Sequence, residues 1–205
     1  MGKQLTVGIP ELDEMIGGFS GGEVILLAGR PAMGKTTLAR RIAEHLTEEH
    51  KRVRFFSLEG SDKGMDLSGI RSEVSTNHFD LVVVDFLQLL THPGSPGRWR
   101  RDIAVAKTLH RLVAGQDIPI LVLSSLTRRT DARKGHVPKP RDILASPLIL
   151  SYVDTVLFLV REGWYDEAEQ DTRLTTIYCT SRQGRKRHAR TNSTQSAVGS
   201  GDCDP

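Results

Sequence analysis

Short apolar runs alternate along this chain with longer segments whose apolar residues recur every three or four positions. The runs are rich in Val, Ile and Leu, which is typical of strands buried on both faces of a sheet. We predict such strands over 23–28, 53–58, 81–85, 120–123, 155–160 and 174–179. The helical periods predict helices over 10–16, 38–49, 70–75 and 99–113, and a short one over 142–152 broken at Pro147. This alternation indicates an α/β fold with a mostly parallel central sheet flanked by helices.

One domain is expected over residues 1–190, followed by a polar tail over 191–205. With 205 residues the chain is long enough to bury a substantial core. The tail is rich in Ser, Thr and Gly and has no apolar period, which predicts disorder. A second polar stretch, 127–141, is basic and contains Pro138 and Pro140, so we expect a mobile loop there.

Composition narrows the class of protein. Hydrophobic residues make up 38% of the chain and charged residues 26%, as in ordinary globular proteins. No apolar run approaches the roughly 20 residues that span a bilayer, and residues 1–10 lack the apolar core of a secretory signal. Cys179 and Cys203 have no metal-ligand spacing. We therefore expect a cytoplasmic protein with reduced thiols and no membrane partner. The net charge of +3 is compatible with nucleic acid but does not require it.

The most informative segment is 29–37, G-R-P-A-M-G-K-T-T, which matches the phosphate-binding pattern G-x-x-x-x-G-K-[ST]. Its glycines allow successive N–H groups to face phosphate oxygens, Lys35 suits the β- and γ-phosphates, and the Thr36 hydroxyl suits Mg²⁺. A glycine-rich turn that binds nothing is the alternative, and the strand before and helix after argue against it. The residues expected to bind nucleotide are Gly29, Arg30, Pro31, Ala32, Met33, Gly34, Lys35, Thr36 and Thr37.

Two acidic residues follow predicted strands. Asp85 closes the run 81–85, which suits a metal-holding carboxylate, with a helix cap as the alternative. Glu59 follows the run 53–58, and ligands of parallel sheets gather beyond the carboxyl ends of strands. We expect Glu59 to orient an attacking water as a general base; an exposed loop glutamate is the other interpretation.

Five segments, in order, resemble the ATPase domain of DnaB-type replicative helicases, which belong to the RecA-like P-loop NTPases. They are T-V-G-I-P-E-L-D-E-M-I-G-G, A-G-R-P-A-M-G-K-T-T, F-S-L-E, L-V-V-V-D-F-L-Q-L-L and L-S-S-L-T-R, within 6–184. The resemblance implies a homo-hexameric ring that binds ATP and Mg²⁺ between subunits and moves on single-stranded DNA. It implies that Lys35 and Thr36 bind phosphate and Mg²⁺, that Asp85 is the Walker B acid, and that Glu59 is the catalytic glutamate.

The same resemblance places Arg182, in T-S-R-Q-G, at the position of an arginine finger that reaches the γ-phosphate of the neighbouring subunit. Without the resemblance Arg182 is one of several solvated charges in the basic run 182–190. Neither the direction of travel nor a primase or loader partner can be read from the sequence.

The chain departs from the family pattern at several places. The stretch between Glu59 and Asp80 is much shortened, Ser125 and Thr180 replace a glutamine and a lysine, and 142–147 reads D-I-L-A-S-P instead of D-L-R-E-S-G. We also expect the closing strand after Gly184 to be missing. The changes at Ser125, Thr180 and 142–147 favour the alternative function, a non-unwinding RecA-like nucleotide-binding assembly or regulatory module. The intact site residues favour the motor; they are Lys35, Thr36, Glu59, Asp85 and Arg182. A RecA-like recombination or clock-type ATPase is a third possibility, against which the D-F-L-Q-L stretch argues.

The basic loop is the candidate DNA contact. By resemblance it points toward the channel of the ring, where phosphate contacts would give sequence-independent, salt-sensitive affinity. No aromatic residue lies between its charges, so base stacking has little support, and a solvated loop is the alternative. The candidate residues are Arg128, Arg129, Arg133, Lys134, Lys139 and Arg141.

Overall fold

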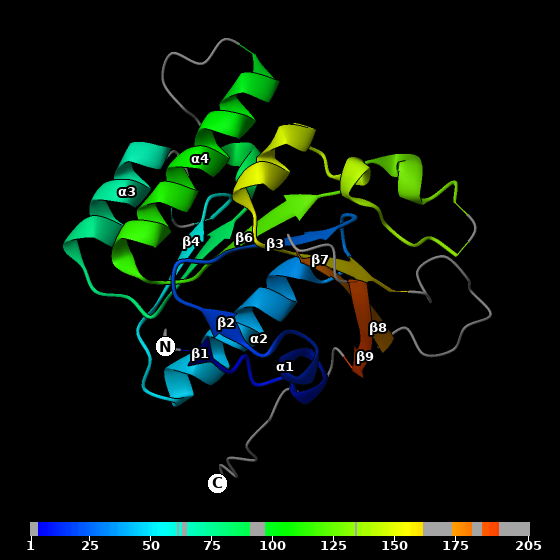
Figure 1. Cartoon of the computed structure of the whole chain (residues 1–205), viewed down its shortest axis with the longest axis horizontal. Helices are drawn as coiled ribbons and strands as arrows, with labels where there is room; N and C mark the ends of the chain where they lie inside the picture. The colour runs from blue at the N-terminus through cyan, green and yellow to red at the C-terminus, as the bar shows by residue number, and fades with distance from the viewer. Residues whose placement is uncertain are drawn as a thin grey trace, which may run out of the picture.

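The computed structural model describes residues 4–60, 62, 65–90, 97–133, 135–161, 174–181 and 186–192. Within these residues the centre is a seven-stranded sheet of order β4-β5-β6-β3-β7-β8-β9, with helices on both faces (Figure 1). Its strands are β3 (Val24–Gly29), β4 (Val53–Ser57), β5 (Leu81–Asp85), β6 (Ile120–Ser125), β7 (Thr155–Val160), β8 (Leu174–Ser181) and β9 (Lys186–Asn192). A separate antiparallel pair joins β1 (Gln4–Leu5) and β2 (Phe19–Ser20).

Four α-helices are described, together with four short 3₁₀ helices. The α-helices are α1 (Pro10–Ile16), α2 (Lys35–Glu48), α3 (Leu67–Thr76) and α4 (Arg98–Gln116). The 3₁₀ helices are η1 (Leu87–Leu89), η2 (Arg128–Thr130), η3 (Pro140–Asp142) and η4 (Pro147–Tyr152). Within the described residues, none of the helices is long and apolar enough to cross a membrane.

The strands β4, β5, β6, β3 and β7 run parallel, and β8 and β9 extend the sheet antiparallel. The mostly parallel sheet expected from the sequence is therefore confirmed. The register aligns the strand ends, because Gly29 lies opposite Ser125 and Ser57 lies opposite Asp85. The loops that follow β3, β4, β5 and β6 consequently leave the sheet at one edge, where ligands bind in open α/β sheets.

Successive residues of the central strands enter two different cores. Leu26 packs with α3 and α4 on one face, whereas Ile25 and Leu27 pack with α1 and α2 on the other. Figure 1 shows these two helical layers on either side of the sheet. Side chains alternate across a strand, so a strand covered on both faces needs apolar residues at every position. This explains the unbroken apolar runs.

The helix boundaries follow local signals. Pro10 begins α1 and Gly17, with a φ of 77°, ends it, which confirms the predicted helix over 10–16. The side chain of Asp66 caps α3 by accepting a hydrogen bond of 2.9 Å from the N–H of Gly69. α3 therefore begins earlier than the predicted helix over 70–75. The helix expected over 142–152 is the 3₁₀ helix η4, which begins at Pro147.

The expectation that the closing strand is missing was wrong. β9 pairs antiparallel with β8, with Ala189 opposite Ile177 and Asn192 opposite Leu174. It lies at the edge of the sheet, where charged side chains are common because one side of the strand faces solvent. Because the strand is basic, its sequence resembles that of a solvated tail. The strand reaches Asn192, beyond the expected domain end at 190, and 193–205 lie outside the described residues.

Candidate nucleotide-binding site

The 29–37 loop joins the end of β3 to the start of α2, as the pattern predicted. Gly34 precedes α2 with a φ of 88°, in the left-handed region that favours glycine. A Cβ at Gly29 would lie 3.2 Å from the backbone oxygen of Leu159 on the neighbouring strand, a tight contact that favours glycine there. The helix then directs the N–H groups of its first turn, and the positive end of its dipole, toward the loop.

Lys35 is the cation of this loop. Its Nζ donates a hydrogen bond of 3.1 Å to the backbone oxygen of Arg30, which holds the side chain across the loop. The pKa of Lys35 is lowered from its ordinary value, first by burial and then by Arg30, while Asp85 and Glu59 act in the opposite direction. Three of the predicted site residues, Lys35, Asp85 and Glu59, are thus close enough to interact electrostatically.

Thr36 and Asp85 meet directly. The Thr36 hydroxyl donates a hydrogen bond of 2.8 Å to Oδ2 of Asp85. A hydroxyl oxygen and a carboxylate oxygen side by side are hard ligands of the kind that Mg²⁺ prefers. Two protein oxygens suffice for this ion, because it keeps several waters and takes its other ligands from the phosphates of its substrate. The donor set therefore fits Mg²⁺.

Glu59 is exposed and follows β4, the strand that pairs with β5. The preceding residue, Leu58, donates its N–H to the backbone oxygen of Asp85 at 2.9 Å, so the chain leaving β4 stays tied to the end of β5. The backbone that carries Glu59 therefore leaves β4 next to the backbone of Asp85. Its role as a general base stays a prediction.

The other residues of the 29–37 loop differ in whether their side chains are paired, buried or exposed. The Arg30 guanidinium pairs with Asp131, with Nε at 3.1 Å from each carboxylate oxygen, and Nη1 donates to the backbone oxygen of Leu126 at 3.1 Å. The Met33 side chain is buried in the core under α2, so its backbone is the part that can face a ligand. The residues with exposed side chains are Pro31, Ala32 and Thr37.

An ion pair joins the middle of the basic loop to the residue that follows it. Arg133 binds the fully buried Asp142 through two hydrogen bonds, Nη1 to Oδ2 at 2.8 Å and Nη2 to Oδ1 at 3.1 Å. Its guanidinium is therefore engaged within the loop, and its contact with DNA stays a prediction. The exposed candidates are Arg128, Arg129, Lys139 and Arg141. Lys134 and the predicted finger Arg182 lie outside the described residues.

Two residues at this edge escaped the sequence analysis. Asp131, the partner of Arg30, belongs to a loop distant in sequence, and no local pattern indicates the pairing. Arg161 follows β7, and its guanidinium would lie 3.1 Å from a Cβ added at Gly34. It also lines a small hollow beside the loop together with Thr37 and Thr191. A basic residue after a parallel strand was the available signal, because ligands gather at such strand ends.

A strand, a glycine loop carrying Lys35 and Thr36, and a carboxylate at the end of a second strand define a P-loop NTPase. The sequence model of the family described as "DnaB-like helicase C terminal domain" matches residues 4–70 and 63–197. The chain belongs to this family.

Curated relatives agree with this family. The chain is 24% identical to the replicative DNA helicase DnaB of Geobacillus stearothermophilus and 26% identical to the replicative DNA helicase DnaC of Bacillus subtilis, with 84% of this chain and 50% of each relative covered. It is 29% identical to the DNA repair protein RadA of Listeria monocytogenes, over 78% of this chain and 38% of that protein. The chain thus spans about half the length of the curated helicases it matches.

Solved structures agree on the RecA-like fold. A DnaB-like replicative helicase, described with its interactions with primase, superposes with a TM-score of 0.83 at 20% identity, covering 92% of this chain and 59% of that one. A second solved structure, described as an ATPase domain, gives 0.83 at 19% identity, covering 92% and 87%. The RadB recombinase gives 0.64 at 19% identity, covering 92% and 96%.

The comparisons also bear on the shortened segment after Glu59. The two parts of the family match overlap at 63–70, inside the stretch between Glu59 and Asp80. The alignment with the Geobacillus helicase runs over 229 positions although it covers only 84% of this 205-residue chain, so it contains gaps in this chain. Both findings agree with a chain that lacks residues its relatives have.

Proposed function

We propose that this chain is the ATP-hydrolysing motor domain of a DnaB-type replicative helicase, which couples hydrolysis to movement on single-stranded DNA in the cytoplasm. The observation that carries the proposal is the meeting of Thr36 and Asp85 beside Lys35, in a chain of this family. These side chains bind and neutralise a triphosphate, which is the chemistry that such a motor requires.

The residues divide the chemistry among them. Lys35 and the backbone N–H groups of the loop bind phosphate oxygens, and Thr36 and Asp85 hold Mg²⁺. The bound ion supplies positive charge to the phosphate oxygens, where negative charge grows in the transition state. Glu59 orients the attacking water and accepts its proton. Arg182 of a neighbouring subunit adds a second positive charge at the γ-phosphate.

The assembly and its substrate belong to the same proposal. A finger acting between subunits needs a head-to-tail interface, and the family of the chain favours closure into a ring, so we propose a homo-hexamer with ATP at the subunit interfaces. The exposed arginines Arg128 and Arg129 contact DNA phosphates in the channel. A primase partner is supported by the solved DnaB-like helicase, which interacts with primase.

A non-unwinding nucleotide-binding module is the second candidate. It is favoured by the pairing of Arg133 with Asp142, which occupies a basic side chain of the DNA-facing loop, and by the serine at position 125. Such a module would bind nucleotide without any response to DNA.

The deciding experiment is the rate of ATP hydrolysis with and without single-stranded DNA, measured together with particle mass by light scattering. A motor hydrolyses ATP faster when DNA is added and forms a hexamer in ATP and Mg²⁺. An ATPase rate that does not change when DNA is added supports the module instead. A particle mass of one subunit at high protein concentration rules out the ring. Lys35→Ala is the control that identifies contaminating activity, because it lacks the phosphate-binding cation.

A further inference from the structure

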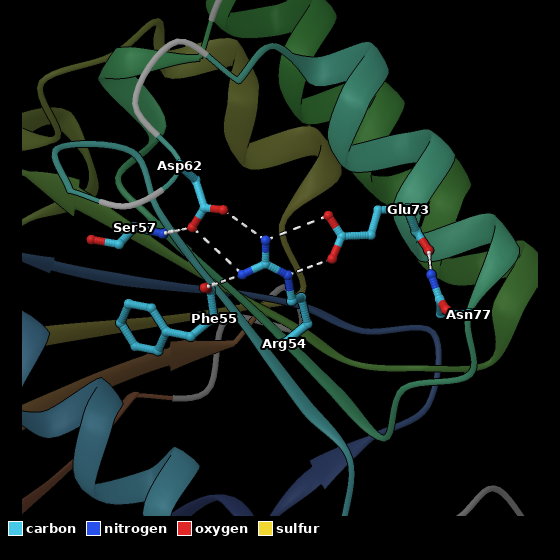
Figure 2. Close-up of polar contacts among 6 residues, drawn as sticks. All are labelled: Arg54, Phe55, Ser57, Asp62, Glu73 and Asn77. Carbon is cyan, nitrogen blue, oxygen red and sulfur yellow. Dashed lines mark hydrogen bonds and ion pairs between the residues drawn. The ribbon is translucent and has the colours of Figure 1, made fainter.

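Arg54, on the edge strand β4, lies at the centre of an ion-pair cluster (Figure 2). Its Nη2 lies 2.7 Å from Oδ1 of Asp62, and its Nε lies 2.5 Å from Oε1 of Glu73 on α3. Nη1 also donates to the backbone oxygen of Phe55 at 2.7 Å, and the guanidinium lies 4.1 Å from the centre of the Phe56 ring. One planar side chain therefore connects β4, α3 and Asp62, which closes the turn that carries Glu59.

Asp62 uses its second oxygen to close that turn. The N–H of Ser57 donates to Oδ2 of Asp62 at 2.9 Å, and the N–H of Asp62 donates back to the Ser57 oxygen at 3.1 Å. The N–H of Gly60 donates to the same Ser57 oxygen at 2.9 Å. Glu59 consequently lies inside a loop closed at both ends by Ser57 and Asp62. Whatever holds Asp62 also fixes the path of the backbone that carries Glu59.

The cluster differs from an ordinary surface ion pair. Such a pair contributes little to the stability of the fold, because solvent screens its charges and two long side chains must be ordered. Here the exposed fractions of the side chains are 24% for Arg54, 10% for Asp62 and 30% for Glu73. The pKa of Arg54 is raised above its ordinary value, first by the hydrogen bond with Glu73 and then, against the lowering effect of burial, by Asp62.

We propose that Arg54 is a positioning residue for Glu59. Held by Glu73 and the Phe56 ring, it anchors Asp62, whose hydrogen bonds with Ser57 hold the backbone that carries Glu59 at the end of β4. The inference rests on the proposed function, because it requires Glu59 to act on the attacking water. It adds a role for three residues, Arg54, Asp62 and Glu73, that lie away from the nucleotide loop.

A double-mutant comparison with Glu59 tests the proposal. Arg54→Met should lower kcat for ATP roughly 10- to 100-fold, the size of effect that a misplaced catalytic group has, while the KM for ATP stays unchanged. In the Glu59→Gln background the same change should cost nothing more, because the positioned group is already lost. If Arg54→Met lowers kcat by the same factor in the Glu59→Gln background as in wild type, the proposal is overturned. Arg52→Met, an exposed arginine just before β4, is the matched control and should behave as wild type.

Hydrogen exchange provides a readout that does not depend on turnover. In Arg54→Met the amides of Gly60 and Asp62 should exchange faster, whereas those of β5 should keep their protection. An unchanged turn, or a uniform loss of protection across the sheet, contradicts positioning by Arg54. In Arg54→Lys the exchange rates of these amides should lie between those of wild type and Arg54→Met. An ammonium cannot bind Asp62 and Glu73 with the two-pronged geometry of a guanidinium.

Failure of the proposed function looks different. If Glu59→Gln is as fast as wild type, Glu59 is not the catalytic base and the positioning role falls with it. If the wild-type chain lacks ATP turnover altogether, the proposed function is refuted, and the exchange comparison still decides whether Arg54 holds the turn.

Discussion

The hydroxyl of Thr36 donates a hydrogen bond of 2.8 Å to the carboxylate of Asp85, which joins the first turn of α2 to the end of β5. The two residues lie far apart in the sequence and on different elements, yet the parallel register brings both to the same edge of the sheet. Both present oxygen atoms that suit Mg²⁺, next to the cation of Lys35.

The Asp85 carboxylate is expected to be essential for turnover rather than for folding. Asp85→Asn keeps the shape and can still accept from Thr36, but it removes the negative charge that holds the metal. We expect kcat for ATP to fall by at least about 10- to 100-fold, as for other losses at metal sites. Titration of activity with Mg²⁺ checks this: a variant with the wild-type Mg²⁺ requirement and wild-type rate would show that Asp85 is a structural cap.

Lys35→Ala is expected to abolish nucleotide turnover. The lysine supplies charge to the phosphates in both the ground state and the transition state, so binding and hydrolysis should fall together. Steady-state ATPase assays and equilibrium binding of a fluorescent ATP analogue measure the two effects. The far-UV circular dichroism should match that of wild type, since Lys35 bonds only a loop oxygen in the described structure. Retained turnover would place phosphate binding elsewhere.

Arg182→Ala is predicted to separate binding from hydrolysis. A finger acts on charge that develops in the transition state, so nucleotide affinity should stay nearly unchanged while hydrolysis falls on the order of 10³-fold or more. Mixing the variant with wild-type subunits tests action between neighbours, because a ring containing both should lose activity at only some interfaces. Equal losses of affinity and rate argue against a finger.

Exposed arginines of the basic loop are predicted to contact DNA phosphates. Replacing Arg128 and Arg129 together by alanine should weaken single-stranded DNA binding for every sequence. The plot of log Kobs against log salt should become shallower by about 1.4, since each lost contact removes about 0.7. Fluorescence anisotropy over a salt series measures this slope. Arg71→Ala, an exposed arginine on α3, is the control, and an equal change in both variants would reveal a non-specific charge effect.

Arg133 and Asp142 are expected to contribute to stability in a pH-dependent way. Burial of the Asp142 carboxyl raises its pKa, but hydrogen bonds from Arg133 and from the N–H of Lys139 oppose it, and the net pKa lies below its ordinary value. The ionised pair therefore stabilises the fold above about pH 4, near the unfolded-state pKa, and the contribution is lost as the pH falls through the folded-state pKa.

Asp142→Asn should accordingly lower the free energy of unfolding by about 1–3 kcal/mol at neutral pH, and the difference from wild type should shrink once the pH falls below the unfolded-state pKa of about 3.9. Urea unfolding across this pH range measures the effect. A difference that stays constant down to the lowest pH would mean that the charge of Asp142 is not its source. Arg129→Met, an exposed arginine of the same loop, should leave stability unchanged.

Local sequence patterns predicted the parallel sheet and the nucleotide loop because strand burial and the glycine turn each leave a pattern within a short stretch of the chain. A run such as 81–85 is apolar since each face is covered, the positive φ of Gly34 favours glycine, and a side chain at Gly29 would crowd the neighbouring strand. The strand that was missed is the charged edge strand β9, although its partner β8 is adjacent in sequence. β9 exists because it pairs with β8, and its charges conceal it.

The side-chain clusters could not be predicted from the sequence either. Nothing near Arg30 indicates that Asp131 will meet it, and nothing near Arg133 indicates that Asp142 will be buried beneath it. The turn after Glu59 looked polar and weakly patterned, yet Arg54 and Asp62 organise it. Charged pairs of this kind have no periodicity, so they become visible only once the fold has placed their elements side by side.

The most direct test of the central claim is calorimetric titration of ATP into the purified chain, in Mg²⁺ and again in excess chelator. If Lys35, Thr36 and Asp85 hold a magnesium-bound triphosphate, saturable binding appears with Mg²⁺ and becomes much weaker without it, and Lys35→Ala binds poorly in both. A chain that takes up neither ATP nor GTP at saturating concentration in Mg²⁺ would contradict the account.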